Sequence, residues 1–102
     1  MIYRILLNIK PTFNAPDTVY LENFNEVGTI EAKSKGEAFI YLNLIADVGF
    51  KEVVKRGYYI NIELDEGVRL RQVVPGDVLV DENNTSYILT PLYLWAIVKM
   101  VI

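Results

Sequence analysis

The chain of 102 residues contains no cysteine and no histidine. Without cysteine it forms no disulfide and offers no thiol nucleophile, and without either residue it lacks the usual zinc ligands. The missing imidazole removes the side chain that titrates most readily near neutral pH. A metal ion could therefore be held only by oxygen ligands.

The sequence is also short of positive charge and of long apolar runs. Its 10 lysine and arginine residues face 13 aspartate and glutamate residues, and the net charge of −3 has the wrong sign for a general nucleic-acid binder. The longest apolar run, residues 92–98, ends at Lys99, well short of the roughly 20 residues of a membrane helix. Arg4 interrupts residues 1–9 and no small-residue cleavage site follows, so we expect no signal peptide, no membrane partner and a cytoplasmic location.

Apolar residues, in contrast, are plentiful. Hydrophobic residues make up 52% of the chain, and the mean hydropathy is positive. A chain of this length forms one domain and can bury roughly two-thirds of its unfolded surface. We predict a single domain over residues 1–102, with apolar surface left over for a partner.

The first third of the chain predicts two strands. Residues 1–9 are mostly apolar, which is typical of a strand buried on one face and part of the other. Residues 10–18 contain two prolines and predict a loop, in which we expect Phe13 to cover the core rather than make an exposed contact. Residues 19–32 begin ambiguously and become a strand, where Gly28 indicates a bulge or a close backbone approach.

Residues 34–48 predict the main helix. Ser34 and Glu37 form a capping box, in which each side chain accepts the other residue's amide. Gly49 is a natural stop, and residues 50–56 add a short helical segment with Phe50, Val53 and Val54 facing inward. The apolar stripe of the main helix consists of Ala38, Tyr41, Leu42, Leu44, Ile45 and Val48.

Two hairpins are predicted after the helices. Residues 58–64 and 68–74 flank a three-residue turn that ends at Gly67, in a register that opposes Leu64 to Val68 and Glu63 to Arg69. Residues 77–82 and 85–90 flank a type I′ turn at Asn83 and Asn84. The expected partners in this second hairpin are Val80 with Tyr87, Leu79 with Ile88, and Val78 with Leu89.

Both faces of the second hairpin are apolar, so it should be central or covered on both sides. Pro91 ends it, and residues 93–102 form a last strand that is also apolar on both faces. Such a strand at an exposed edge would promote aggregation, so it either lies centrally or pairs across a dimer axis. We take four of its side chains as a candidate protein interface: Tyr93, Trp95, Ile97 and Met100.

Basic residues offer a second candidate site. Five of them lie near Tyr58 and Tyr59 in the sequence, and could contact phosphates while the tyrosines stack on bases. The alternative is a solvated surface with pairing between Glu63 and Arg69, which the acidic total charge favours. The candidate nucleic-acid-binding residues are Lys51, Lys55, Arg56, Arg69 and Arg71.

The carboxylates near the turns form a third group: Asp65, Glu66, Asp77, Asp81 and Glu82. An oxygen-ligand metal site or a carboxylate acid–base pair is conceivable. However, the spacing matches no metal loop, and aspartate is favoured in turns for its local hydrogen bonds. We therefore predict no catalytic residues, no metal site and no cofactor.

Several stretches follow one another in a recognisable order: Ala15-Pro16-Asp17, ENFNEVGTIEA at residues 22–32, GDVLVD at 76–81 and YIL at 87–89. In this order the chain resembles the small YodL-like proteins carried by plasmids, phages and other mobile elements. Their pattern has Ser-x-Ser shortly before Gly-Asp, where this chain has Gln72, Val73 and Val74. The resemblance implies a mobile-element context and transfers no catalytic residues.

The composition separately resembles that of orphan proteins from archaeal filamentous viruses. It combines the absence of cysteine and histidine with a single glutamine and many isoleucine, valine and tyrosine residues. Both resemblances imply a viral or mobile-element protein that acts inside a host cell.

The expected fold is α+β, with one main helix packed on a mostly antiparallel sheet of about six strand segments. The expected function is a non-enzymatic protein-interaction or regulatory module, homodimeric, with a host or viral protein as partner. The alternative is a nucleic-acid-binding accessory protein that uses the basic residues, and a carboxylate-dependent hydrolase ranks last.

Overall fold

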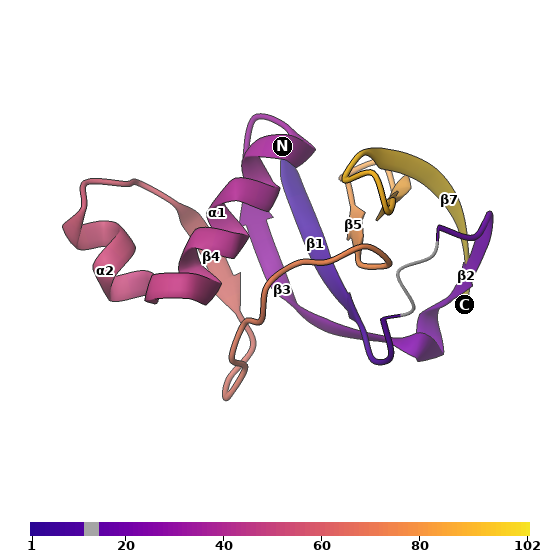
Figure 1. The fold of residues 1–102 in the computed structure, drawn as a ribbon, viewed down its shortest axis with the longest axis horizontal. Helices are drawn as coiled ribbons and strands as arrows, with labels where there is room; N and C mark the ends of the chain where they lie inside the picture. The colour runs from indigo at the N-terminus through magenta and orange to yellow at the C-terminus, as the bar shows by residue number, and fades with distance from the viewer. Residues whose placement is uncertain (12–14) are drawn as a thin grey trace.

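The computed structural model describes residues 1–11 and 15–102, and Phe13 lies outside these residues. Two α-helices accompany one seven-stranded sheet (Figure 1), which confirms the α+β class and the main helix, and the sheet has one strand more than the predicted total of about six. The elements are β1 (Ile2–Asn8), β2 (Thr18–Tyr20), the 3₁₀ helix η1 (Leu21–Asn23), β3 (Phe24–Glu31), α1 (Lys35–Val48), α2 (Phe50–Lys55), β4 (Asn61–Leu64), β5 (Val78–Val80), β6 (Ser86–Leu89) and β7 (Trp95–Val101).

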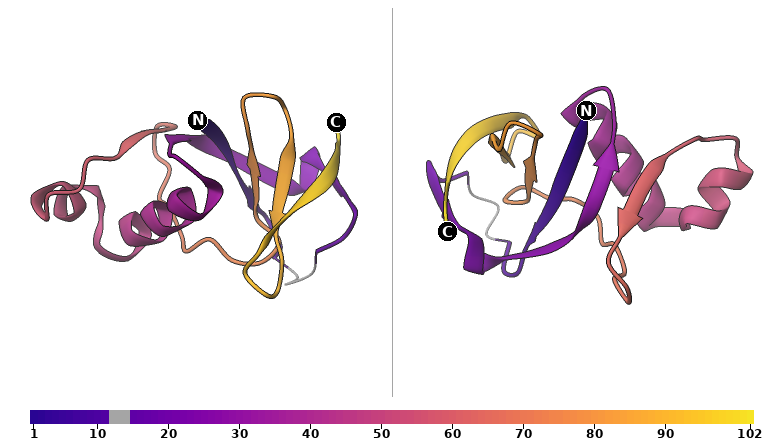
Figure 2. Two further views of the ribbon diagram at one scale, coloured as in Figure 1. Left: turned by 90° about the horizontal axis from the view of Figure 1, so that it is seen from above. Right: turned by 180° about the vertical axis from the view of Figure 1, so that it is seen from behind.

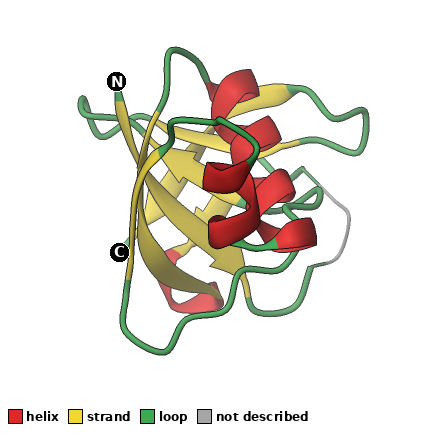
Figure 3. Ribbon diagram, turned by 90° about the vertical axis from the view of Figure 1, so that its left-hand side faces the viewer, coloured by secondary structure: helices red, strands yellow, loops and turns green. Residues whose placement is uncertain are grey.

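The strand order in the sheet is β2-β7-β6-β5-β1-β3-β4. Every neighbouring pair is antiparallel except β2 and β7, so the sheet is mostly antiparallel, as predicted, but mixed. The two α-helices lie together on one face of this sheet (Figure 3).

The sheet has a hydrophobic core on each of its faces. On the helix side, Ile5 and Leu79 join α1 residues such as Leu42 in one cluster of buried side chains. On the other side the sheet curls, so that Leu6 of β1 and Val98 of β7 share a second cluster. The curl explains why strands near its centre are apolar on both faces, and it confirms that the second hairpin is covered on both sides.

Gly28 combines a bulge with a close backbone approach, and both predictions for it are confirmed. Opposite β1, Gly28 pairs with Ile5 and Glu26 pairs with Leu6, which leaves one extra residue on β3. The φ angle of Gly28 is +150°, and a Cβ atom there would lie 2.0 Å from the carbonyl oxygen of Glu63 in β4. Only glycine therefore fits between β1 and β4 at this position.

α1 begins and ends close to the predicted residues. The Glu37 amide donates to Ser34 Oγ at 3.1 Å, as expected for the capping box. The Glu37 carboxylate accepts the amide of Lys33 at 3.1 Å, one residue before the predicted partner. Gly49, with φ of +87°, ends the helix. The three buried residues of α1 are Ala38, Leu42 and Ile45, all from the predicted stripe.

α2 forms as predicted, but only part of its apolar stripe faces the core. Val53 is fully buried, whereas Phe50 and Val54 are exposed, so the prediction that all three face inward was wrong. The reason is the position of α2, which lies past the edge strand β4 at one end of the molecule (Figures 1 and 2). The sheet ends before it can cover the whole stripe.

The predicted hairpin of residues 58–64 with 68–74 was wrong. β4 pairs with β3 instead, with Ile62 opposite Ile30. The turn itself is as expected, since Gly67 has φ of +77° and the Val68 amide donates to the Asp65 carbonyl at 3.1 Å.

Residues 68–74 form no strand and instead run alongside α1; we call them the crossing segment. Leu70 and Val73 are both buried in the helix-side core, a three-residue spacing that a strand with alternating faces could not provide. The Asn43 side chain of α1 accepts the Val73 amide at 2.6 Å. The crossing segment therefore packs against α1 and does not pair with β4.

The predicted register of the second hairpin was wrong by one residue. The observed partner of Val80 is Ser86, because the loop has three residues rather than two. Asp81 Oδ1 accepts the amides of Asn83 and Thr85 at 2.9 and 3.0 Å, which fixes a type I turn. Asn84 alone then takes the left-handed conformation, with φ of +62°.

β7 lies between β6 and β2, although β2 opposes only residues 99–101. The predicted start at Tyr93 was wrong, because the strand begins at Trp95. Residues 91–93 form a second three-residue loop, in which the Thr90 amide donates to the Leu94 carbonyl at 2.8 Å and Tyr93 has φ of +60°. The last strand is therefore partly central within the curled sheet.

Candidate interaction surfaces

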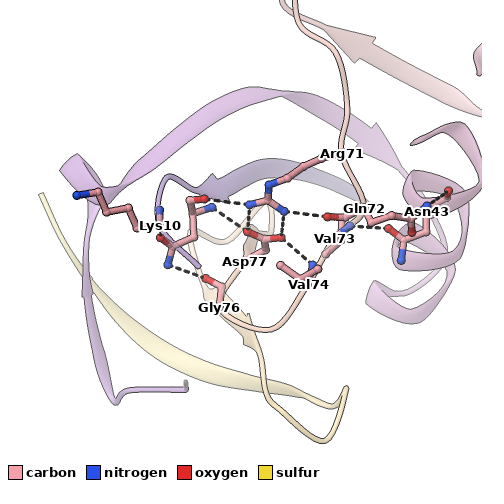
Figure 4. A network of polar contacts seen from close by, with 9 residues as sticks. Lys10, Asn43, Arg71, Gln72, Val73, Val74, Gly76 and Asp77 are labelled. Atoms are coloured by element: carbon pink, nitrogen blue, oxygen red, sulfur yellow. Dashed lines mark hydrogen bonds and ion pairs between the residues drawn. The ribbon is translucent and has the colours of Figure 1, made fainter. Parts of the chain in front are cut away.

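An ion pair joins Arg71 of the crossing segment to the buried carboxylate of Asp77 (Figure 4). Asp77 is 1% exposed, and Arg71 Nη1 and Nη2 donate to its Oδ2 and Oδ1 at 2.7 and 2.8 Å. The Asn8 and Val74 amides donate to the same carboxylate, each at 2.8 Å. Arg71 also donates to the carbonyls of Asn8 and Gln72 at 2.9 and 2.8 Å. This Arg71–Asp77 network fastens the end of β1 to the crossing segment and to the start of β5.

The network uses one of the predicted nucleic-acid contacts for structure. Hydrogen bonding to Asp77 raises the pKa of Arg71, and the guanidinium is held in a bidentate pair. Arg69 is exposed on the same segment. The other predicted residues, Lys51, Lys55 and Arg56, are exposed on or directly after α2, and Arg56 pairs with Glu52 at 3.1 Å. The basic residues thus come from two separate elements.

Three of the carboxylates near the turns, those of Asp77, Asp81 and Glu82, hold the backbone of their own loop or of β1. Asp81 holds its loop as described, and Glu82 accepts the Ile2 amide at 2.6 Å. Glu63 is not among the ion-paired residues in residues 1–11 and 15–102, where the pairs are Arg4 with Glu26, Arg56 with Glu52, and Arg71 with Asp77. Within the same described residues, no group of three acidic side chains could hold a metal ion.

Tyr3 is a buried tyrosine whose pKa responds to burial and to the charges of Asp81 and Glu82. Burial first, and then the charge of Asp81, raise the pKa of Tyr3. The unfolded tyrosine titrates near pH 10, so the folded chain keeps a proton that the unfolded chain loses. The stabilisation from Tyr3 is complete below about pH 10 and is lost as the pH rises through the folded pKa. We expect the free energy of unfolding to fall above about pH 10, and to fall less steeply in Tyr3→Phe.

Urea unfolding at a series of alkaline pH values measures this slope. Tyr59→Phe, the same substitution at a tyrosine that is 98% exposed, is the matched control. Equal slopes for Tyr3→Phe and the natural chain would contradict the assignment.

The loop between β6 and β7 exposes several large apolar side chains next to one another. Leu92 is 81% exposed, and Tyr93 and Leu94 are each more than half exposed. On the strand that follows, Ile97 is 73% exposed and lies opposite Tyr87 of β6. We call Leu92, Tyr93, Leu94 and Ile97 the β6–β7 surface. Exposed apolar residues that gather in this way are typical of sites that bind another protein.

The conformation of Tyr93 is strained and is fixed by packing. A tyrosine with φ of +60° costs on the order of 1 kcal/mol, because its Cβ crowds the backbone. The Tyr93 ring contacts Phe39 of α1 edge to face, with centroids 6.1 Å apart, and Phe39 contacts Trp95 in the same way at 6.5 Å. These contacts hold the loop against α1, so the β6–β7 surface lies on a loop that is fixed to the helix.

The four residues predicted as an interface do not share one face. Tyr93 and Ile97 belong to the β6–β7 surface, while Trp95 is partly buried in the helix-side core. Met100 packs against the core inside the curl, where it borders a cavity of about 400 Å³. Sequence reasoning missed Leu92 and Leu94, which it counted only as part of an apolar run. The signal was Pro91, which places the bulky residues after it in a turn.

No described helix is both long and apolar enough to span a bilayer. Comparisons of the chain with family models, with curated protein sequences and with solved structures gave no match.

Proposed function

We propose that the chain is a non-enzymatic protein-interaction module that binds a partner protein through the β6–β7 surface. The observation that carries the proposal is the exposure of three successive large apolar side chains on a loop held by aromatic contacts, and of Ile97 on the strand that follows. Tyrosine, here Tyr93, is enriched among the residues that contribute most to protein interfaces, and a side chain that is already held in place loses little conformational entropy on binding. The partner that we expect is a host or viral protein.

The double variant Leu92→Asp and Ile97→Asp tests the proposal. Both side chains are exposed, so the fold should persist, while two carboxylates in an apolar interface should weaken binding by roughly tenfold or more. The measurement is affinity capture from host-cell lysate on the immobilised chain, with the bound proteins quantified by mass spectrometry.

The matched control is Lys51→Asp with Lys55→Asp, which changes two exposed residues of α2. It should capture the same proteins as the natural chain. If the lysine variant loses its bound material, and that material is nucleic acid, the nucleic-acid alternative replaces the proposal. Equal capture by the natural chain and the Leu92 and Ile97 variant would also end it.

A further inference from the structure

β4 is an edge strand whose outer side carries unpaired backbone groups. The Asp65 amide donates to the Val27 carbonyl at 2.9 Å, and this bond sets the alternation of the β3–β4 ladder. Glu63 and Asn61 therefore direct their backbone groups to β3, while those of Ile62 and Leu64 point away from it. Within residues 1–11 and 15–102, no other protein group forms a hydrogen bond with these outward N–H and C=O groups.

The β4 edge is short, at four residues, but it lacks the other features that usually protect an edge strand. It contains no proline, no lysine and no bulge, and only Glu63 is charged. Two neighbouring features are unexplained in a single copy of the chain. Tyr59, just before the strand, is 98% exposed, and the apolar side chains of Phe50 and Val54 are exposed on α2, which lies past the edge (Figure 2).

We propose that two copies of the chain associate through β4, which pairs antiparallel with β4 of the second copy about a two-fold axis at Ile62. The unpaired N–H and C=O groups require a β-strand as the occupant, and a second copy supplies one of the same length. The proposal is independent of the proposed function, because it uses the opposite end of the sheet from the β6–β7 surface.

The side chains select this register among those that the backbone allows. With the axis at Ile62, Asn61 lies opposite Glu63 of the second copy, an amide against a carboxylate, and Ile62 lies opposite itself. An axis at Glu63 would place two carboxylates opposite each other. An axis at Asn61 would leave most of the strand opposite residues 58–60, which are not in a strand.

The same symmetry accounts for the exposed apolar residues of α2. Antiparallel strands in one sheet are related by an axis perpendicular to the sheet, so both copies keep their helices on the same face. Each α2 then lies over the junction, where Phe50 and Val54 meet the second copy instead of solvent. Tyr59 falls opposite Asp65 of the second copy, at the margin of the same junction.

Single cysteines test the register, because the natural chain has none. In a hydrogen-bonded antiparallel pair, opposite Cα atoms are about 5.5 Å apart, within the range of a disulfide. Under oxidising conditions, Ile62→Cys should therefore form a covalent dimer. Asn61→Cys should not, since its two copies are offset by two residues, about 7 Å along the strand, beyond disulfide reach. A dimer linked through Asn61→Cys or Ile97→Cys, with none through Ile62→Cys, would overturn the proposal.

Sedimentation equilibrium of the full chain tests the association itself. The natural chain should approach twice its mass of 11.7 kDa as concentration rises. Ile62→Pro removes only an outward N–H, which leaves the β3–β4 ladder intact. It should raise the dissociation constant about 30-fold, which corresponds to roughly 1 kcal/mol for each of the two lost hydrogen bonds. Ile62→Ala, which keeps the N–H, is the control for the lost side chain and should dimerise more tightly than Ile62→Pro.

A natural chain that stays monomeric at every concentration would end the proposal, as would an Ile62→Pro variant that dimerises as tightly as Ile62→Ala. The Leu92→Asp and Ile97→Asp variant should dimerise like the natural chain. Loss of the dimer in that variant would assign the dimer interface to β7 instead and overturn the β4 proposal. The proposed function would still be decided by the capture experiment alone.

Discussion

Replacing Asp77 with alanine should lower the free energy of unfolding by about 4 kcal/mol. Asp77 is 1% exposed, and its carboxylate accepts four hydrogen bonds, two from Arg71 and one each from the amides of Asn8 and Val74. Alanine leaves the amides of Asn8 and Val74 without a partner and removes the counter-charge of Arg71, whose guanidinium keeps only the carbonyls of Asn8 and Gln72. The cost is that of an orphaned charge and two orphaned amides, not merely that of a lost ion pair.

Urea unfolding followed by circular dichroism measures this loss, and a double-mutant cycle locates it. Arg71→Ala alone should cost less than Asp77→Ala, because its side chain is 38% exposed and the Asp77 carboxylate keeps two amide donors. The double variant should cost clearly less than the sum of the two single variants, since it leaves no charge unpaired. Asp65→Ala, at an exposed turn carboxylate, is the matched control and should stay within about 0.5 kcal/mol of the natural chain.

An Asp77→Ala variant within 1 kcal/mol of the natural chain would show that water replaces the lost carboxylate. In that case the Arg71–Asp77 network would be an incidental surface contact. A strong effect would instead show why the turn at Gly76 and Asp77 belongs to the scaffold, as its sequence context already indicates.

Local chemistry made several parts of the fold predictable. The Ser34 and Glu37 pair and Gly49 mark the ends of α1, because caps and stops act within one turn of helix. Gly28 likewise predicted a bulge or a close backbone approach, although the partners of its strand were not yet known. The apolar residues on both faces of the second hairpin required cover on both sides, and the curled sheet provides it.

What could not be predicted depends on residues far apart in the chain. β4 has an apolar face that fits either β3 or the crossing segment, and only the position of α1 over Leu70 and Val73 decides between them. The register of the second hairpin turned on one side chain, since Asp81 favours a type I turn over the type I′ turn that Asn83 and Asn84 suggest.

The candidate sites show the same division. Arg71 looked like a member of a basic patch, because its partner Asp77 is six residues away across a turn that sequence alone does not position. The β6–β7 surface was only half recognised, because the exposure of Leu92 depends on a loop length set by Thr90 and Tyr93. The outward groups of Ile62 could not be found at all before the partner of β4 was known.

Replacing Gly28 with alanine should be the second most damaging change, with a loss of about 3 kcal/mol in the free energy of unfolding. The added Cβ would lie 2.0 Å from the Glu63 carbonyl oxygen and 2.9 Å from Leu64 Cα, and both atoms belong to backbone that cannot rotate away. The φ angle of +150° adds strain for any residue with a side chain. β4 must therefore separate from β3 at this point, or β3 must distort against β1.

Gly36→Ala is the matched control, because it is the same substitution at a site with room for the added Cβ atom. Gly36 lies in the first turn of α1, where the nearest atom to an added Cβ is Ser34 Oγ at 3.8 Å. Alanine there should raise the free energy of unfolding by about 0.4–1 kcal/mol, because it restricts the unfolded chain and favours the helix. The two variants should thus change stability in opposite directions.

Gly28→Ala also tests how β4 is held, because its effect should be concentrated on one strand. Hydrogen exchange should show loss of protection at the Glu63 and Asp65 amides, which bond to β3, while the amides of α1 stay protected up to global unfolding. If the dimer forms through β4, this variant should also be monomeric, since a displaced strand cannot present Ile62 to a second copy. A Gly28→Ala chain that keeps both the stability and the β4 protection of the natural chain would mean that β3 moves freely around Gly28, and the close packing of β4 on β3 would have to be abandoned.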